Sequence, residues 1–330
     1  MNKEIVAYLI IGIVASFLIS KNFTKWLIPK LISVKMGQKI LDIGPRWHKN
    51  KEGTPTMGGL AFLLAYFVMF VLLIAFAVFR NQVEDVRITA AVFLFTLANG
   101  AIGFIDDYTK FFKKQNKGLS ASVKFLLQFV VATAFTIYVA YLKDFSAVLY
   151  IPFADIEVYL GWGWYIVSIL IITGIVNSVN LTDGVDGLAA SVTFFVSCFF
   201  AVAGAVAAMC DLVILAAVII GICLGFLVYN INPAKIFMGD TGSLFLGGAV
   251  VSMAYMLDNP LILLVVGIIY VIEAASDIIQ VSVYKLTGKR VFKMAPIHHH
   301  FEQCKWSEMK IVVVFCSVTI IFCILAFFGI

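Results

Sequence analysis

Five aspartates could do chemistry because each lies where an apolar segment meets a polar one. They are Asp106, Asp107, Asp183, Asp186 and Asp240. Carboxylates are costly at a membrane boundary and tend to be functional there. Their oxygen atoms bind Mg²⁺ together with phosphate oxygens and water. The aspartates therefore indicate a site for a metal ion and phosphates. For Asp106 and Asp107 alone, which end the third apolar segment, a simple helix stop is the alternative.

Amides accompany two of these aspartates. Polar side chains recur every third residue, as Asn177, Asn180, Asp183 and Asp186. Gly184 lies between the two aspartates and Gly187 follows them, and both glycines favour a turn after Thr182, at the end of the fifth apolar segment. The pattern predicts a binding cleft at the membrane surface that is lined by amides and carboxylates, with a plain polar turn as the alternative. A Ca²⁺ loop of the EF-hand type is not indicated, because its spacing and its final Glu are missing.

Asp240 lies between two glycines, Gly239 and Gly242, just before an apolar segment. This arrangement would place a carboxylate beside the N–H groups of a helix N-terminus, which suits a metal-bridged phosphate. A phosphate-binding P-loop is absent, because the chain has no GxxxxGK[ST] sequence. Phe237 could stack on a base, or it could simply pack at the interface.

Three consecutive histidines, His298 to His300, lie in the last polar connection. Consecutive residues on a helix cannot all bind one ion, and HExxH is absent, so zinc is disfavoured. The imidazoles could instead donate hydrogen bonds or transfer a proton near a phosphate. Upstream, Glu273 and Gln280 belong to a polar stripe that must face the bundle or a wet cleft, in a structural or a substrate-binding role.

The elements that carry these residues are predicted to be membrane helices. Hydrophobic residues make up 62% of the 330, charged residues 13%, and the mean hydropathy is +1.02. A soluble globule could not bury so many apolar side chains, and continuous apolar runs disfavour a β-barrel. We expect an all-α integral membrane protein of one domain, residues 1–330, with about ten spans. The predicted spans are 4–20, 58–79, 88–105, 122–142, 162–180, 188–208, 212–230, 244–257, 260–284 and 309–329.

Basic residues predict the orientation of these spans in the lipid bilayer. All Lys and Arg except Lys3, Arg80, Arg87 and Lys143 lie in or beside the odd-numbered connections. By the positive-inside rule these connections, near 21–57, 106–121, 181–187, 231–243 and 285–308, are cytoplasmic. Both termini are then extracytoplasmic and the active site faces the cytoplasm. The basic face could be topological only, or it could hold phosphates. No nucleic-acid partner is expected, because no basic module interleaved with aromatic residues is visible.

Five stretches together resemble phospho-N-acetylmuramoyl-pentapeptide transferases of the MraY type, within the polyprenyl-phosphate N-acetylhexosamine-1-phosphate transferases. The stretches are residues 53–59, 106–110, 177–187, 230–248 and 294–302. Their order and spacing cover nearly the whole chain, and residues 294–302 resemble the muramoyl-pentapeptide version. The chain departs from the pattern at Lys305, where Gly is expected, and at residues 314–316, where an Arg-Phe-Trp-like run is expected.

The resemblance implies a reaction. Undecaprenyl phosphate attacks the sugar-bearing phosphate of UDP-N-acetylmuramoyl-pentapeptide, UMP leaves, and lipid I forms in the bacterial cytoplasmic (inner) membrane. Mg²⁺ is the implied cofactor, with Asp240 as its main ligand and Asp106 or Asp107 as another. Either Asp106 or Asp107 would orient or deprotonate the lipid phosphate. We favour direct attack over an aspartyl-phosphate intermediate, because a phosphate monoester is already largely dianionic. A homodimer is a family expectation.

The resemblance also implies substrate-binding residues, and His298 as a fourth catalytic residue beside the three aspartates. Residues expected to hold the uridine are Lys51, Asp186, Asn230 and Phe237. Those expected near phosphates are Lys110, Lys124, Asn177 and Asn180. His298 and His299 would act near the pyrophosphate or the sugar, and Thr56, Asp183 and His300 complete the substrate-binding set. The alternatives are a sibling N-acetylglucosamine-1-phosphate transferase and a secondary transporter, although the inverted repeats and midplane acids of transporters are not visible.

Overall fold

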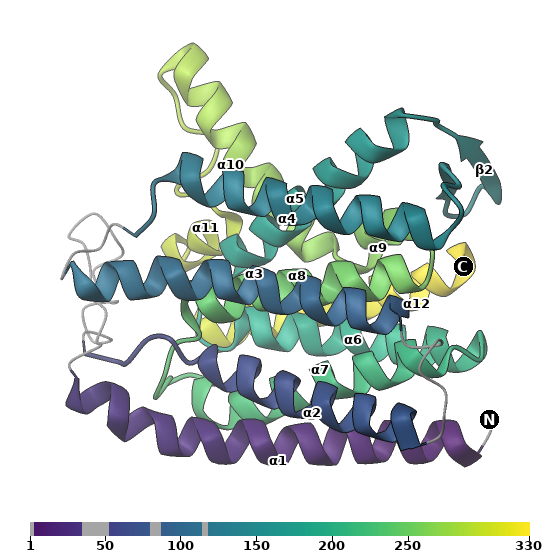
Figure 1. The fold of residues 1–330 in the computed structure, drawn as a ribbon. Coiled ribbons are helices and arrows are strands. Elements are labelled where there is room, and N and C mark those ends of the chain that lie inside the picture. The colour runs from purple at the N-terminus through teal and green to yellow at the C-terminus, as the bar shows by residue number, and fades with distance from the viewer. Residues whose placement is uncertain (1–2, 35–52, 80–86, 114–117) are drawn as a thin grey trace.

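The protein, represented by a computed structural model, is built almost entirely from helices (Figure 1). The structure describes residues 3–34, 53–79, 87–113 and 118–330. The long helices are α1 (Lys3–Ser33), α2 (Leu60–Phe79), α3 (Arg87–Phe112), α4 (Ala121–Leu142), α5 (Gly163–Thr182), α6 (Leu188–Val206), α7 (Cys210–Asn230), α8 (Gly239–Met256), α10 (Ile268–Thr287) and α12 (Glu308–Ala326). The short elements are β1 (Val148–Ile151), β2 (Ile156–Tyr159), η3 (Pro260–Ile262), α9 (Leu263–Val266), α11 (Ile297–Gln303) and η4 (Phe327–Gly329).

The helices agree with a multi-pass membrane protein. Within the described residues, seven helices are long and apolar enough to cross a membrane, and a bent helix pair raises this to eight. The seven are α1, α3, α4, α5, α6, α7 and α12. Of the other two expected spans, α2 is a helix of 20 residues without a charged side chain, and α8 is helical but less apolar. A count of ten spans, and the membrane face that each end occupies, stay predictions.

The helix α8 runs through the centre of the bundle, beside α3 (Figure 1). Every residue from Thr241 to Met256 is buried, so this helix meets other helices rather than lipid. Glycines allow the close packing: a Cβ at Gly247 would lie 2.8 Å from the backbone of Val176 on α5, and one at Gly248 would lie 3.2 Å from Thr96 on α3. A helix that is covered by protein can tolerate small and polar residues, which explains why α8 is less apolar than the helices that face lipid.

Two predicted helix ends and one predicted continuous span were wrong. The first helix continues to Ser33 instead of ending near residue 20. The third continues to Phe112, so Asp106 and Asp107 lie inside a helix and do not end it. The segment 260–284 is not one straight helix, because its two parts, Pro260–Val266 and Ile268–Thr287, are bent by 82°. Gly267 lies at the bend, where glycine adds no Cβ that would crowd the carbonyl oxygen of Leu263.

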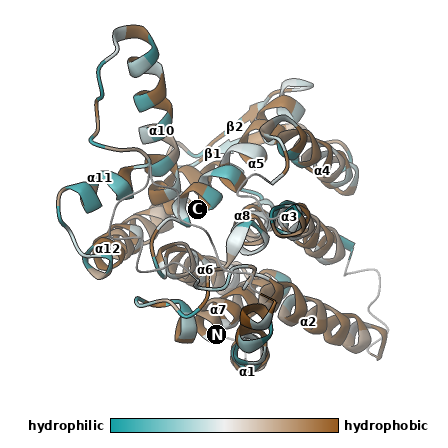
Figure 2. Ribbon diagram, turned by 90° about the vertical axis from the view of Figure 1, so that its left-hand side faces the viewer, coloured by the Kyte–Doolittle hydropathy of each residue, from teal (hydrophilic) through white to brown (hydrophobic). Residues whose placement is uncertain are grey.

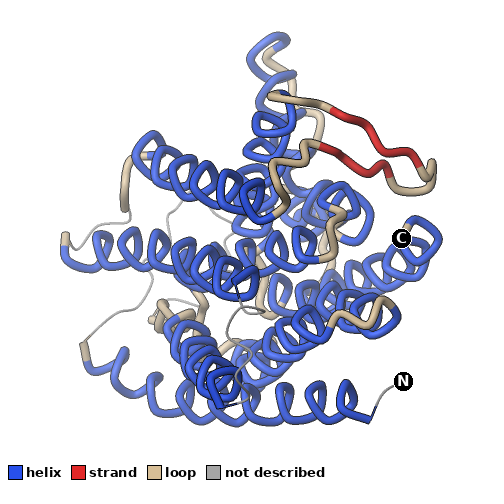
Figure 3. Tube along the Cα trace, turned by 45° about the vertical axis from the view of Figure 1, so that its right-hand side comes forward, coloured by secondary structure: helices blue, strands red, loops and turns tan. Residues whose placement is uncertain are grey.

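A two-stranded hairpin was not predicted. The strands β1 and β2 are antiparallel, with Val148 opposite Tyr159, and they project from the end of α4 (Figure 3). Each strand has only four residues, so no sustained alternation of apolar and polar residues marks them in the sequence.

The two ends of the bundle differ in polarity. Figure 1 places the start of α1 and the end of α12 at the same end of the molecule. At the other end, hydrophilic residues gather on α11, whereas the outer helices α1, α2 and α4 are mostly apolar (Figure 2). The predicted active-site residues lie at the more polar end, where α3 finishes and α8 begins.

Lys305 follows α11 in a left-handed backbone conformation, with φ of 65°. Glycine adopts this conformation without the steric cost that other residues meet, which explains why glycine was expected at this position. We expect Lys305→Gly to stabilise the protein by about 1 kcal/mol, measured as a higher thermal unfolding midpoint in detergent. Lys305→Ala is the matched control and should show no such gain, because alanine keeps the strained Cβ.

Candidate active site

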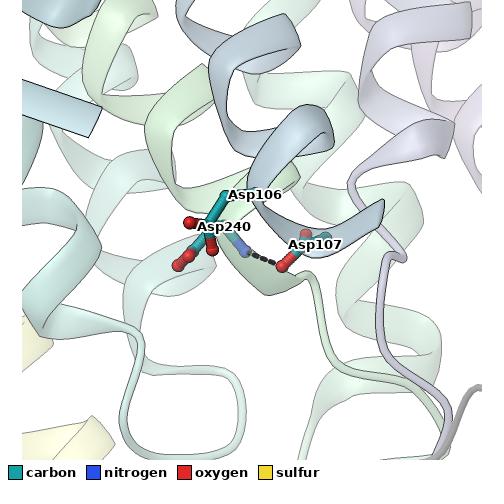
Figure 4. Close-up of side chains that lie close together, drawn as sticks. All are labelled: Asp106, Asp107 and Asp240. Atoms are coloured by element: carbon teal, nitrogen blue, oxygen red, sulfur yellow. Dashed lines mark hydrogen bonds between the residues drawn. The ribbon is translucent and has the colours of Figure 1, made fainter. Parts of the chain in front are cut away.

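Three aspartates from two helices meet at the polar end of the bundle. Asp106 and Asp107 come from α3 and Asp240 from the first turn of α8, and one oxygen from each lies within 4.8 Å of the others. Figure 4 shows the three carboxylates around the junction of the two helices. Asp106 and Asp107 are 3% and 4% exposed, whereas Asp240 is partly exposed. Asp240 is therefore the carboxylate most open to an incoming ligand.

Asp107 caps the N-terminus of α8. Its carboxylate accepts hydrogen bonds from the Asp240 N–H (3.2 Å), the Thr241 N–H (2.9 Å) and the Thr241 hydroxyl (2.7 Å). The first N–H groups of a helix have no partner within the helix, and a negative charge there is stabilised by the helix dipole. Asp107 thus fixes the start of α8, and with it the position of Asp240.

Asp240 is the centre of a charged network. One of its oxygens lies 2.7 Å from Lys110 Nζ and 3.1 Å from Lys124 Nζ. The other accepts a hydrogen bond from the Asn180 side-chain amide (2.8 Å). Helices α3, α4, α5 and α8 each contribute a residue, so the network forms only when all four are packed together.

Asp106 joins the network to the connection between α3 and α4. Its carboxylate accepts the Leu119 N–H (2.8 Å) and pairs with Lys110 Nζ (2.6 Å). A Cβ at Gly118 would lie 2.5 Å from the same carboxylate oxygens, so the backbone approaches closely there. Asp106 has fewer backbone donors than Asp107, and its lysine partner is shared with Asp240.

The charges of this network suit a bound cation. Lys110 Nζ contacts all three carboxylates, at 2.6, 3.5 and 2.7 Å. Even with Lys124 included, the carboxylates exceed the lysines by one formal negative charge. Oxygen ligands in a cluster with residual negative charge are the donor set of hard divalent cations. The residues present therefore fit a divalent metal ion.

Gly103 lets α3 lie directly against the start of α8. A Cβ at this position would overlap the carbonyl group of Asp240. Because the obstacle is backbone, the two helices would have to separate. We expect Gly103→Ala to lower turnover by about tenfold or more through displacement of Asp240, measured as the rate of product release at saturating substrate. Gly174→Ala is the control, since a Cβ there meets no atom within 4 Å; equal rates for both variants would contradict this role.

The segment 53–59 also supports the start of α8. The Phe237 N–H donates to the Pro55 carbonyl oxygen, and the Gly58 N–H donates to the Phe237 carbonyl oxygen, both at 2.8 Å. Thr56 lies beside Gly239, where a Cβ would be 3.0 Å from the Thr56 hydroxyl. Two of the predicted substrate-binding residues, Thr56 and Phe237, are thus placed next to the aspartate cluster by backbone pairing.

The two predicted asparagines of α5 have different surroundings. The Asn180 amide donates to Ser243 (2.7 Å) as well as to the aspartate cluster, and Lys124 Nζ lies 3.5 Å from its oxygen. Asn177, one turn earlier, exchanges hydrogen bonds of 2.8 and 3.3 Å with Gln128 on α4. Asn177 therefore joins two helices, whereas Asn180 belongs to the site itself.

Asp186 organises the turn between α5 and α6. Its carboxylate accepts hydrogen bonds from the Asn232 side chain and the Ala234 N–H, both at 3.0 Å. Its own N–H donates to Glu308 at the start of α12 (3.1 Å). Asp186 is buried and links three segments of the chain at the polar end.

Asn230 holds the same turn from the other side. Its side chain accepts the Gly187 N–H (3.1 Å) and donates to the Ile236 carbonyl oxygen (2.8 Å). It is 2% exposed, so its amide is already engaged by backbone groups. Asp183, in the same turn, is partly exposed.

His298 is buried between α10 and the turn at residues 183–187. Its Nδ1 lies 2.9 Å from Glu273 Oε2, and both side chains are at most 1% exposed. A Cβ at Gly184 would overlap His298 Nε2. Both nitrogens of the ring are therefore covered by protein.

The other two histidines are bound locally. His299 Nδ1 lies 2.6 Å from Glu302 on the same short helix, α11. His300 Nδ1 accepts the Lys293 N–H (3.1 Å). His299 is thus bound within α11 and His300 is bound to the segment that precedes α11, and the two do not converge on one ion with His298.

The structure gathers six predicted site residues into one network: Asp106, Asp107, Asp240, Lys110, Lys124 and Asn180. Lys51 lies outside the described residues. Sequence reasoning missed three residues that position the site: Thr241, Gln128 and Glu308. Gln128 carried a signal as a polar residue inside an apolar span, and Thr241 lies within the stretch 230–248 that the sequence analysis singled out.

Residues 89–258 match the family model described as "Glycosyl transferase family 4", which takes in the aspartate cluster. Residues 51–63 match "Phospho-N-acetylmuramoyl-pentapeptide-transferase signature 1". The class defined by fold and site is thus that of helical membrane glycosyl transferases.

Curated relatives show which family of membrane glycosyl transferases the chain resembles. A phospho-N-acetylmuramoyl-pentapeptide-transferase of Clostridium acetobutylicum is 47% identical over 97% of this chain and 98% of its own length. Proteins of the same name from Acetivibrio thermocellus and Caldicellulosiruptor bescii are 45% and 44% identical, each over 96% of this chain and over 93% and 96% of their own lengths. The chain belongs to the phospho-N-acetylmuramoyl-pentapeptide-transferase family.

Proposed function

We propose that this protein transfers phospho-N-acetylmuramoyl-pentapeptide from UDP-N-acetylmuramoyl-pentapeptide to undecaprenyl phosphate. An oxygen of the lipid phosphate attacks the sugar-bearing phosphorus, the bond from that phosphorus to the UMP oxygen breaks, and lipid I and UMP result. The observation that carries the proposal is the aspartate cluster with Lys110 and Lys124, in a chain nearly colinear with relatives of that name.

The aspartate cluster would hold Mg²⁺, with Asp240 as main ligand and Asp106 or Asp107 beside it. Bound there, the ion would supply neutralisation of the charge that develops on the phosphate oxygens. Asp240 is the preferred ligand because it is the most exposed carboxylate of the three.

Lys110 and Lys124 would hold phosphate oxygens of the two substrates. Both ammonium groups already lie at the carboxylates, at 2.7 and 3.1 Å from Asp240, and both are partly exposed. Phosphoryl transfer depends mainly on positioning and on charge neutralisation, which lysines at this place provide. Asn180 would orient Asp240 through its amide hydrogen bond.

Asp106, rather than Asp107, would orient or deprotonate the lipid phosphate. Asp107 is occupied by three donors from the start of α8. Asp106 accepts a single backbone N–H, and its other carboxylate oxygen is paired with Lys110. We propose direct attack, and a trapped phosphorylated aspartate in single-turnover work would contradict it.

The nucleotide would lie beside the turn at residues 183–187, with Asp186, Asn230, Phe237 and Lys51 around the uridine. Asn177, Thr56, Asp183, His299 and His300 would complete the substrate-binding set. We place the enzyme in the bacterial cytoplasmic membrane, with its site facing the cytoplasm, and we propose a homodimer.

Release of UMP from two nucleotide sugars tests this function. The purified protein, undecaprenyl phosphate and Mg²⁺ would be incubated with UDP-N-acetylmuramoyl-pentapeptide or with UDP-N-acetylglucosamine. We expect UMP only with the first. Release with the second alone would indicate the sibling transferase, and release with neither would contradict both transferase functions.

Removal of the metal should stop the reaction. Because the carboxylates need a counter-charge before they can approach anionic phosphates, we expect a chelator to lower UMP release by about a hundredfold or more. Excess Mg²⁺ added after the chelator should restore the rate. Full activity in the presence of the chelator would contradict a metal-dependent mechanism.

A further inference from the structure

A buried carboxylate–imidazole pair lies outside the aspartate cluster. Glu273 of α10 and His298 of α11 are 0% and 1% exposed, and their side chains meet at 2.9 Å. Burying two such polar groups is costly unless they are well bound to each other, so the pair has to be maintained by precise packing. None of the steps proposed above uses Glu273.

The geometry of the pair determines which way the imidazole points. Nδ1 faces the Glu273 carboxylate, and a carboxylate only accepts hydrogen bonds, so Nδ1 carries the donated proton. A carboxylate bound to one ring nitrogen of a histidine fixes both its tautomer and its orientation. The opposite nitrogen, Nε2, is directed at the backbone of Gly184.

The His298 ring occupies the space that a side chain at residue 184 would need. A Cβ at residue 184 would overlap Nε2 and would lie 2.6 Å from Cε1 of the same imidazole. Within the described residues, Nε2 has no hydrogen-bond partner and almost no accessible surface. The ring therefore touches the turn at residues 183–187 by direct packing, and it is not open to a reacting phosphate.

The same turn is held at its other end by polar contacts. Asp186 is bound by Asn232, Ala234 and Glu308. At the Gly184 end of the turn, the backbone packs against the ring of His298. The two ends together define the position of Asp183 and Asp186, which lie on either side of Gly184 and Val185.

We propose that Glu273 is a positioning residue that acts through His298: it fixes the imidazole, and the imidazole holds the 183–187 turn in the conformation that binds the nucleotide sugar. This proposal rests on the proposed function. It gives His298 a positioning role in place of the hydrogen-bonding or proton-transfer role near the pyrophosphate or sugar that the sequence analysis expected.

A split between KM and kcat tests the proposal. The full-length protein would be assayed for UMP release at saturating undecaprenyl phosphate, with UDP-N-acetylmuramoyl-pentapeptide varied. For Glu273→Leu and for Gly184→Ala we expect KM to rise about tenfold while kcat stays within about threefold, because a pre-organised binding turn is lost and the reacting groups are intact. Glu273→Gln should keep KM near that of the unmodified protein, since its amide oxygen still accepts the Nδ1 proton.

Controls separate positioning from general damage. Gly174→Ala, where a Cβ has open space, should leave KM and kcat unchanged. The double variant Glu273→Leu/Gly184→Ala should have the KM of either single variant, because both changes release the same turn. Thermal midpoints would verify that each variant is folded, and Glu273→Gln keeps the test meaningful if Glu273→Leu fails to fold.

Three results would overturn the proposal. The first is an unchanged KM in Glu273→Leu and Gly184→Ala. The second is a fall in kcat of about a hundredfold at constant KM in these variants, which is the size expected when a proton-transfer group is lost. The third is a change in KM in the double variant that, expressed as a free energy, equals the sum of the two separate effects. Absence of UMP release from the unmodified protein would instead refute the proposed function, so the two failures can be told apart.

Discussion

Replacing Asp240 by asparagine should lower UMP release by about a thousandfold while the protein stays folded. The asparagine keeps the shape and can still accept the Asn180 hydrogen bond, but it removes the charge that faces Lys110 and Lys124. It also removes the most exposed carboxylate of the cluster, and with it the proposed main metal ligand. Steady-state UMP release at saturating substrates, across a range of Mg²⁺ concentrations, measures the effect.

Asp258 provides the matched control for this change. It follows the opposite end of α8, is exposed, and pairs with Lys143. Asp258→Asn should therefore leave the rate and its Mg²⁺ dependence unchanged. An active Asp240→Asn enzyme would contradict both the metal assignment and the central place of Asp240.

The second large effect is expected at Asp107, and it combines stability with activity. Asp107→Ala would leave two backbone N–H groups and one hydroxyl at the buried start of α8 without their acceptor. We expect the free energy of unfolding to fall by about 2–4 kcal/mol, because a helix cap and buried hydrogen bonds are lost together. UMP release should also fall by about a hundredfold or more as Asp240 is displaced.

The adjacent aspartate separates these two effects. Asp106→Asn should reduce UMP release as strongly but should lower the thermal midpoint much less, because Asp106 accepts only one backbone N–H and the asparagine oxygen can still accept it. The thermal unfolding midpoint and the rate of UMP release, measured for Asp106→Asn and for Asp107→Ala, show whether stability and activity are affected separately. Equal destabilisation by both would show that the capping role of Asp107 is wrong.

Some features of the site could be predicted because they depend on residue type alone. Charged residues are so rare in an apolar chain that acids at segment ends are conspicuous, and Asp106, Asp107 and Asp240 were found in this way. The role of each acid could not be predicted, because Asp106 and Asp107 are the same residue type at adjacent positions. What distinguishes them is that the carboxylate of Asp107 is on the side of α3 that meets the start of α8. That distinction exists only once the two helices are packed.

Other features escaped prediction because they arise from backbone contacts. The close approach of Gly103 to Asp240 and the pairing of residues 55–59 with residues 237–238 join parts of the chain that are far apart in sequence. The 82° bend at Gly267 and the short hairpin leave no periodic pattern of apolar residues. His298 looked like a reactive group from its neighbours in the sequence, and its burial against Gly184 became visible only in the fold.

Hydropathy and charge are properties of single residues and short segments, so the order of amino acids was enough to indicate a helical membrane protein with acids and lysines for phosphate chemistry. The packing of the helices determines which aspartate is the most exposed of the three, which one caps a helix and which histidine is buried. Those roles depend on distances of a few ångströms between helices, and such distances are set by how glycines and side chains pack across the bundle.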